Sequence, residues 1–364
     1  MKIKEITNFL ESWAPPSLQE SYDNAGLIIG DPSDDISAVL ITLDITEEVM
    51  DEAINEKCNL IIAHHPLIFS GIKRINKNHW VDKCIRKAIK NDIAIYAIHT
   101  NLDNIRTGVN LQIAAKIGLN NLKVLNPKSS TLSKLTVFVP VESKHELLNG
   151  LFKAGAGKIG NYDLCSFQLD GIGTFRGNQN ANPAIGSPNT DEHVNETRIE
   201  VLVHRHLEGD VLSAMRKHHP YEEVAYYLSE LRNENQEVGS GMIGYLDKEM
   251  DVNHFLQSLK KSMNLNSIKH TKLIKDTVSK VAICGGSGSF LLQSAIRADA
   301  DIFISSDFKY HDYFEANDSI VIADIGHYES EVFTKNLLYD ELTKTFTSFV
   351  FCLSITDTNP IKYL

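Results

Sequence analysis

The chain has 364 residues, a length that accommodates two or three domains of ordinary size. Hydrophobic residues make up 43% and charged residues 23%, which excludes a disordered, collagenous or coiled-coil chain. The 36 lysines and arginines are outnumbered by 47 aspartates and glutamates, so the formal net charge is −11. Because an acidic surface repels phosphate backbones, this balance disfavours nucleic acid as a partner.

The cysteines and the N-terminal segment bear on the compartment. Five cysteines are scattered along the chain without a CxxC motif, which is typical of a reducing environment. No apolar run approaches the roughly 18–20 residues of a membrane helix. Glu5, Asn8 and Glu11 interrupt the stretch where a signal peptide needs an unbroken apolar segment. We therefore predict a cytoplasmic protein without a membrane segment.

Short apolar strands and helical patterns alternate in the first third of the chain. Runs rich in β-branched residues predict strands at 37–44, 59–63 and 93–98. Thr46 is a good N-cap for a helix after the first strand, and helical spacing of apolar residues predicts a second helix at about 80–90. This alternation predicts a mostly parallel sheet covered by helices.

The same alternation returns near the C-terminal end, whereas the middle of the chain differs. The late elements are strands at 280–284, 301–305, 319–324 and 348–353, and a helix at about 330–346. The middle elements are strands at 134–140, 196–204 and 224–231 and helices at 145–154 and 207–217, with a loop expected at 171–195. The middle order suits a β-α-β-β-α-β ferredoxin-like α+β unit. We predict an inserted domain at 128–235 and a discontinuous α/β domain at 1–127 plus 236–364.

Histidine or carboxylate side chains follow four of the predicted strands. In chain order they are His64 and His65, His99 and Asp103, Asp307, and Asp324 and His327. Ligands of open α/β sheets bind at the carboxyl ends of the strands, so we expect these side chains at one edge of one sheet. Glu331 comes four residues after His327, and a helix starting there would put both on one face.

Five of these residues form a candidate metal-binding set, namely His64, His65, Asp103, His327 and Glu331. Neutral imidazole and carboxylate are the ligands that zinc, manganese, iron and cobalt accept. A single catalytic zinc keeps three protein ligands, whereas five ligands with one bridging carboxylate fit two ions about 3.5–4 Å apart. For any one histidine the alternative is a structural residue held by hydrogen bonds, but the coincidence at four strand ends argues against it for the set.

A second His-His-Pro sequence at 218–220 provides an internal comparison. It follows Arg216 and Lys217 at the end of a predicted helix instead of an apolar strand, and no histidine–carboxylate cluster surrounds it. We interpret this pair as structural or interfacial.

Three further segments have two interpretations each. After the strand at 301–305, Lys309 is predicted to hold an anionic substrate group and His311 to transfer protons near neutral pH; the alternative is an exposed loop. The polar segment 22–26 either orients a metal-bound histidine or caps a turn. The Gly-Gly-Ser-Gly segment at 285–288 could present N–H groups to phosphate, but it lacks the lysine of a P-loop, which favours tight packing.

Taken in order, these motifs resemble those of the GTP cyclohydrolase 1 type 2 homologues, also called the NGG-one-interacting-factor-three-like family. The segments that carry the resemblance are 22–27, 64–67, 99–103, 285–288, 307–312 and 326–331. The chain departs from the family pattern at Ser305 and Ser306, where Thr-Gly is usual. The resemblance extends over nearly the whole chain.

The resemblance implies a dinuclear metal site with His64, His65, Asp103, His327 and Glu331 as ligands and Glu331 as the bridge. Zinc is the expected metal, with manganese or iron as alternatives. It also implies a toroidal homohexamer and an insert similar to PII or CutA proteins. The function expected is a metal-dependent hydrolase acting on a nucleotide or related small molecule. The alternative is a metal-stabilised scaffold or regulatory module without catalysis, whose insert senses a ligand.

Overall fold

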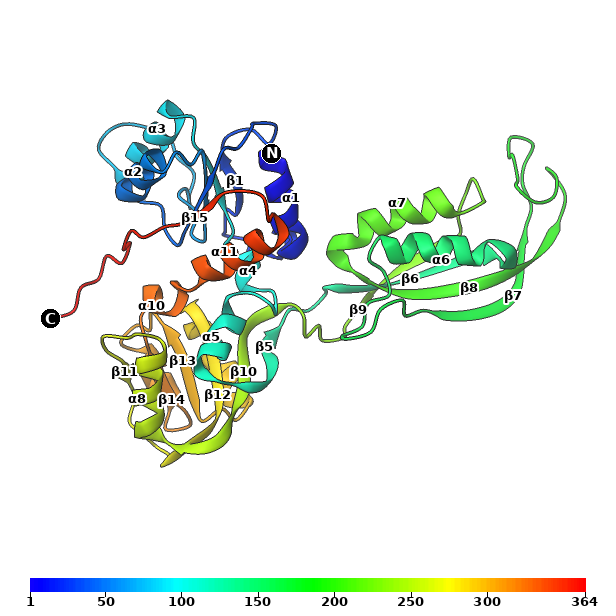
Figure 1. Ribbon diagram of the computed structural model, residues 1–364. Helices are drawn as coiled ribbons and strands as arrows, with labels where there is room; N and C mark the ends of the chain where they lie inside the picture. The colour runs from blue at the N-terminus through cyan, green and yellow to red at the C-terminus, as the bar shows by residue number, and fades with distance from the viewer. The chain divides into compact units, whose positions relative to one another are not determined.

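The computed structural model describes residues 1–364, which divide into two compact units (Figure 1). The main unit comprises Met1–Pro127 and Glu237–Leu364, and the inserted unit comprises Lys128–Gln236. The main unit contains two sheets and the inserted unit contains one. No helix in the chain combines the length and the apolar character needed to cross a membrane.

The first sheet of the main unit has five strands and is mostly parallel. Its order is β1 (Gly26–Ile29), β4 (Ala94–Ala97), β3 (Leu60–Ala63), β2 (Val39–Thr42) and β15 (Phe351–Leu353). Only the β1–β4 pair is antiparallel. Every residue of β2, β3 and β4 is buried, as expected for strands that are covered on both faces.

Helices cover both faces of this sheet. The helices of the N-terminal part are α1 (Ile3–Trp13), α2 (Glu47–Asn55) and α3 (Trp80–Lys90). Apolar residues of α1 pack with Val39 and Ile41, whereas those of α2 and α3 pack with Leu40 on the opposite face. As predicted, Thr46 caps α2: its hydroxyl accepts a hydrogen bond from the Val49 N–H at 3.3 Å.

The second sheet has six strands and is mixed. Its order is β11 (Lys269–His270), β14 (Val321–Asp324), β13 (Ile302–Ser306), β12 (Thr277–Ser287), β10 (Gly239–Asp251) and β5 (Asn120–Pro127). Only the β12–β13 and β13–β14 pairs are parallel, so the expectation of a mostly parallel sheet is wrong here. β5 precedes the insertion and β10 follows it. These two strands form an antiparallel pair.

The remaining helices of the main unit contact the second sheet or each other, and the last of them also contacts β15 and β2 of the first sheet. They are α4 (Thr100–Asp103), α5 (Val109–Ile117), α8 (Val252–Ser262), α9 (Leu292–Arg297), α10 (His327–Glu331) and α11 (Thr334–Thr345). The single helix expected at 330–346 is thus divided into α10 and α11. Gly285–Ser287 are the last residues of β12, and a 3-10 turn at Ser289–Leu291 leads from them into α9. One continuous hydrophobic core contains residues of both sheets, for example Ile62 and Ile304.

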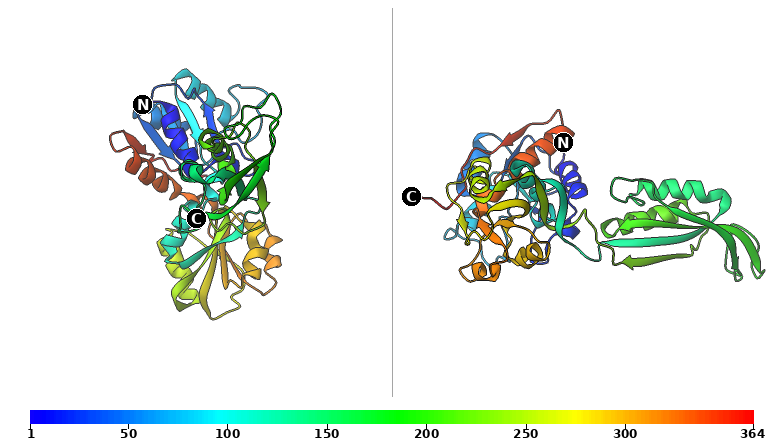
Figure 2. Two further views of the ribbon diagram at one scale, coloured as in Figure 1. Left: turned by 90° about the vertical axis from the view of Figure 1, so that its right-hand side faces the viewer. Right: turned by 90° about the horizontal axis from the view of Figure 1, so that it is seen from below.

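The inserted unit has the β-α-β-β-α-β order expected from the sequence. Its elements are β6 (Leu132–Pro140), α6 (Lys144–Lys153), β7 (Phe167–Phe175), β8 (Glu192–His204), α7 (Glu208–His218) and β9 (Tyr226–Leu231). The antiparallel strand order is β7-β8-β6-β9, and α6 and α7 lie on one face of the sheet (Figures 1 and 2). Part of the loop expected at 171–195 is strand, because β7 extends to Phe175 and β8 begins at Glu192.

Candidate metal centre

Most of the histidines and carboxylates at the strand ends meet in one cluster, to which both sheets of the main unit contribute. His64 and His65 follow β3, and His99 follows β4, both in the first sheet. His327 and Glu331 lie on α10, which contacts β12 and β13 of the second sheet and lies at the ends of β13 and β14 (Figure 1). The expectation of one edge of one sheet is therefore wrong, because strand ends of two sheets converge on the cluster.

Glu331 lies at the centre of the cluster. Its Oε2 atom lies 3.0 Å from Nε2 of His65 and 3.0 Å from Nε2 of His327. Its Oε1 atom lies 4.0 Å from Nε2 of His64, and Asp103 Oδ1 lies 3.5 Å from the same nitrogen. The structure thus brings together all five residues that the sequence analysis selected as candidate metal ligands.

Each histidine of the cluster is held through its other ring nitrogen. The Nδ1 atoms lie within hydrogen-bond distance of these oxygens: His64 to the Ile98 carbonyl (2.8 Å), His65 to Asp44 (2.6 Å), His99 to Asp23 (2.7 Å) and His327 to Asp307 (2.6 Å). An acceptor at Nδ1 fixes the ring orientation, and in the neutral ring it leaves the Nε2 lone pair for a metal, as in histidines that bind metals. The cluster is therefore oriented for ligation at Nε2.

His99 joins the cluster, although it was not among the five selected residues. Ring nitrogens of His64, His65 and His99 lie within 4.8 Å of one another. Asp23, which holds His99, also accepts a hydrogen bond from the Thr100 N–H at 3.0 Å. The polar segment 22–26 thus orients a histidine, and the strand-end position of His99 was the signal that could have identified it.

Two buried polar atoms in the cluster lack a hydrogen-bond partner, and they test whether a cation fits there. They are Nε2 of His64 and Oδ1 of Asp103. His64 is fully buried, and an unsatisfied polar group away from water is costly. A divalent cation would satisfy the imidazole lone pair and the carboxylate oxygen together. The surrounding set of imidazole and carboxylate, without a thiolate ligand, is one that zinc, manganese and iron all accept.

Protonation of the cluster reflects its concentration of carboxylates. Burial opposes the charged form of His65, but hydrogen bonds with Asp44 and Glu331 outweigh it and raise the pKa to about 10. Burial also opposes the charged form of His327, but hydrogen bonds with Asp307 and Glu331 outweigh it and raise the pKa of His327 to about 11. Burial lowers the pKa of His64 to about 3, which leaves this imidazole neutral. Protons thus balance the charge of Glu331, and a bound cation would displace them.

The Gly-Gly-Ser-Gly segment supports Glu331 by close packing. Gly286 has a φ of +59°, and a Cβ there would collide with Glu331 Oε1. The Gly286 N–H donates to Ser330 Oγ at 2.9 Å, and its carbonyl accepts hydrogen bonds from Ser305 Oγ (3.1 Å) and Ser306 Oγ (2.5 Å). The packing interpretation is favoured over phosphate binding, and the two serines that depart from the family pattern hold this backbone.

Other residues selected from the sequence lie outside the cluster. Lys309 and His311 are exposed on the segment after β13, and neither belongs to the groups of candidate ligands. Asp324 accepts a hydrogen bond from the Tyr313 hydroxyl at 2.9 Å and pairs with Lys269 at 2.8 Å. Asp324 is thus engaged in contacts within the second sheet and its neighbouring segment.

The second His-His-Pro sequence has structural contacts. His219 Nε2 lies 2.8 Å from the Phe138 carbonyl, and its Nδ1 accepts from the Tyr221 N–H at 3.1 Å. Burial lowers the pKa of His219, which keeps the ring neutral for these two bonds. Both ring nitrogens are engaged, so no lone pair is left for a metal, as in the structural interpretation.

The C-terminal segment contributes hydrogen bonds next to the cluster that no sequence motif indicates. Thr358 donates a hydrogen bond to Asp44 Oδ2 at 2.6 Å, and Asn359 donates to Glu329 Oε1 at 3.0 Å. Upstream, Thr356 donates to Glu52 Oε2 at 2.6 Å. No spacing or composition marks these residues as neighbours of a histidine more than 290 positions away, so no sequence signal could have identified Thr358.

Comparison with known proteins agrees with the fold and the motifs. The family model described as Duf34/NIF3 (NGG1p interacting factor 3) matches residues 1–360, and the chain belongs to this family. The resemblance predicted from the motifs is thus confirmed.

Named relatives and solved structures extend the agreement to full length. A Halalkalibacterium halodurans protein named GTP cyclohydrolase 1 type 2 homolog is 40% identical over 324 residues, which cover 88% of this chain and 87% of that protein. A Staphylococcus epidermidis protein of the same name is 37% identical over 367 residues and the whole of both chains. The crystal structure of a Bacillus cereus protein related to NIF3 superposes with a TM-score of 0.88 at 38% identity, covering 100% of this chain and 99% of that one.

Proposed function

We propose that the chain is a metal-dependent hydrolase with a dinuclear centre, acting on a nucleotide or a related small molecule. The observation that carries this proposal is that two groups of candidate ligands share one residue. His64, Asp103 and Glu331 form one group, and His65, His327 and Glu331 form the other. A carboxylate with one oxygen toward each group is suited to bridge two ions.

The protein's own residues would hold and orient the metal ions. His64, Asp103 and Glu331 would bind one ion, and His65, His327 and Glu331 the other, with His99 close to both His64 and His65. The acceptors at the Nδ1 atoms keep the rings aimed at these positions. When bound, paired divalent ions polarise a substrate and activate water for attack on an electrophilic carbon or phosphorus.

Two relatives are named GTP cyclohydrolase 1 type 2 homolog, which makes nucleotides the first class to test. We keep Lys309 and His311 as proposed contacts for a substrate anion and for proton transfer. Their exposure leaves them accessible to a substrate, and Asp307 on the same segment holds His327.

We propose a cytoplasmic location, a toroidal homohexamer, zinc as the metal with manganese or iron as alternatives, and a PII- or CutA-like insert. The β-α-β-β-α-β order of the inserted unit supports the last of these.

Metal content per chain, measured by elemental analysis on freshly purified protein, tests the proposal. We expect close to two divalent ions in the unaltered chain and a sharp loss in Glu331→Ala. Asp340→Ala, an exposed carboxylate on α11, is the matched control and should retain the metal. A content of zero or one ion that Glu331→Ala leaves unchanged would contradict the dinuclear centre.

The second candidate is a metal-stabilised scaffold or regulatory module whose insert binds a ligand. A cavity of about 650 Å³ in the inserted unit favours it. Melting temperature and assembly mass with and without a chelator distinguish the two candidates. Collapse of the assembly on chelation would favour structural metal, whereas a folded and fully assembled metal-free protein would favour catalysis.

A further inference from the structure

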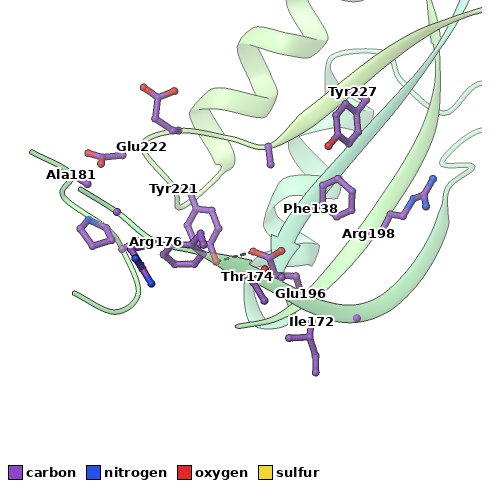
Figure 3. A pocket seen from close by; sticks show the side chains of 18 of the residues that line it. Phe138, Ile172, Thr174, Arg176, Ala181, Glu196, Arg198, Tyr221, Glu222 and Tyr227 are labelled. Atoms are coloured by element: carbon purple, nitrogen blue, oxygen red, sulfur yellow. Dashed lines mark hydrogen bonds between the residues drawn. The ribbon is translucent and has the colours of Figure 1, made fainter. Parts of the chain in front are cut away.

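The cavity of the inserted unit, whose lining is drawn in Figure 3, lies on the face of the sheet opposite the core residues that pack under α6 and α7. Along β6, Val137 and Val139 belong to the core under the helices, so Phe138 between them points to the opposite face. Glu196 and Arg198 of β8 line the cavity with Phe138. A volume of about 650 Å³ suits a small organic molecule.

Two pairs of aromatic rings line this cavity. The ring centroids of Phe138 and Tyr227 lie 6.0 Å apart, and those of Phe175 and Tyr221 are also separated by 6.0 Å. Tyr227 is 64% exposed, so its ring is accessible from solvent. Aromatic faces attract cations, and ammonium groups are commonly bound among several rings.

A buried carboxylate lies between these ring pairs. Glu196 is only 9% exposed, and its Oε1 atom accepts a hydrogen bond from the Tyr221 hydroxyl at 3.0 Å (Figure 3). Gly173 on β7 leaves room for this carboxylate, because a Cβ there would collide with Oε2. One neutral hydroxyl does not balance a negative charge that has lost most of its water.

The cations near the cavity already have carboxylate partners. Arg176 pairs with Asp191 through both guanidinium and carboxylate groups, and Arg198 donates to Glu200. Neither arginine makes a salt bridge with Glu196. The charge that the cavity leaves unbalanced is therefore negative.

We propose that this cavity binds an organic cation, such as a protonated primary amine or a quaternary ammonium ion. The ammonium group would lie against Glu196, and the carbon skeleton would pack on the aromatic rings. This site lies in the inserted unit and is independent of the proposed metal chemistry, since it needs none of the metal ligands.

Calorimetric titration of the full chain with putrescine, spermidine and tetramethylammonium tests the proposal, with ATP as the anionic control. Glu196→Gln removes the charge but keeps an acceptor for the Tyr221 hydroxyl. We expect at least one amine to bind and Glu196→Gln to weaken it about tenfold or more. Glu192→Gln, on the same strand but outside the cavity lining, should leave the affinity unchanged.

A second variant and a stability measurement distinguish a loss of binding from a folding defect. Tyr227→Leu keeps an apolar side chain but removes a ring face, and it should also weaken the amine. Glu196→Gln should melt at or above the temperature of the ligand-free parent, because it relieves an unbalanced buried charge. The proposal is overturned if no amine binds, if Glu196→Gln binds the amine as tightly as the parent, or if ATP binds more tightly than every amine.

Discussion

Thr358 Oγ1 lies 2.6 Å from Asp44 Oδ2, and the other carboxylate oxygen of Asp44 lies 2.6 Å from His65 Nδ1. A residue near the C-terminal end thus fixes the carboxylate that orients a candidate metal ligand. Burial opposes ionisation of Asp44, but the hydrogen bonds from His65 and Thr358 outweigh it and lower the pKa of this carboxyl. Thr358 is therefore a positioning residue for His65.

Replacement of Thr358 by valine should weaken metal binding. The substitution keeps the shape of the side chain but removes the donor, so Asp44 can rotate away from His65. Loss of such a supporting contact typically lowers metal affinity about 10- to 100-fold. Competition with a chromophoric zinc chelator measures the affinity without any assay of turnover.

Thr356→Val is the matched control for this substitution. Thr356 also donates to a carboxylate at 2.6 Å, but its partner Glu52 touches no histidine of the cluster. Thr358→Ser restores the hydroxyl and should restore the affinity. Equal zinc affinity in Thr358→Val and the parent would show that Asp44 holds His65 without help from the C-terminal segment.

Gly286→Ala should displace the Glu331 carboxylate and so weaken metal binding. The new Cβ would collide with Glu331 Oε1, and a φ of +59° is unfavourable for alanine. We expect a loss of metal content and a fall of about 1–3 kcal/mol in the free energy of unfolding. Denaturant unfolding and elemental analysis measure the two effects.

Gly71→Ala controls for the loss of a glycine in the main unit. A Cβ at Gly71 would have no atom within 4 Å, and this residue does not have a positive φ. It should leave both stability and metal content close to those of the parent. Normal metal content in Gly286→Ala would mean that Glu331 can shift without consequence.

The candidate ligands at the strand ends can be predicted from the sequence because each lies next to its strand along the chain. Each buried strand is a short run of β-branched residues, and the polar residue that follows it is visible in the same segment, as with His64 after β3. Four candidate ligands were selected on this basis, Glu331 was added through its helical spacing from His327, and the five meet in the structure.

What the sequence did not predict depends on contacts between distant segments. β5 is the edge strand of the second sheet and pairs antiparallel with β10, and nothing in the sequence of either strand specifies its partner. The support of Asp44 by Thr358 and the division of the cluster between two sheets have the same origin. Such contacts are set by tertiary packing, which periodicity does not encode.

The stability of the metal-free protein should fall as the pH rises from about 6.5 to 9. His65 and His327 have pKa values of about 10 and 11 in the folded chain, above the ordinary value of 6.5. A raised pKa contributes stability that is fully present below about pH 6.5 and is lost as the pH rises through the folded value. Melting temperatures of chelated protein across this range measure the decline.

His65→Gln should make that decline shallower, because one of the two titrating groups is removed. Zinc added to the chelated protein in weak buffer should release protons, since ligation at Nε2 requires neutral imidazole. A flat melting profile together with zinc uptake free of proton release would contradict the charged state of His65 and His327.

His99→Gln separates a metal ligand from a histidine that is merely well packed. His99 has its Nδ1 atom on Asp23 and lies in the group with His64 and His65, so we expect its replacement to lower zinc affinity about tenfold or more. His219→Gln is the comparison, because both of its ring nitrogens are engaged in the inserted unit. It should cost about 1–3 kcal/mol of stability through the lost bond to the Phe138 carbonyl, while zinc affinity stays unchanged. Zinc titration and thermal melting of both variants measure these opposite patterns. If His99→Gln lowers stability but binds zinc like the parent, His99 is a structural partner of Asp23 and the ligand set is limited to the other five residues.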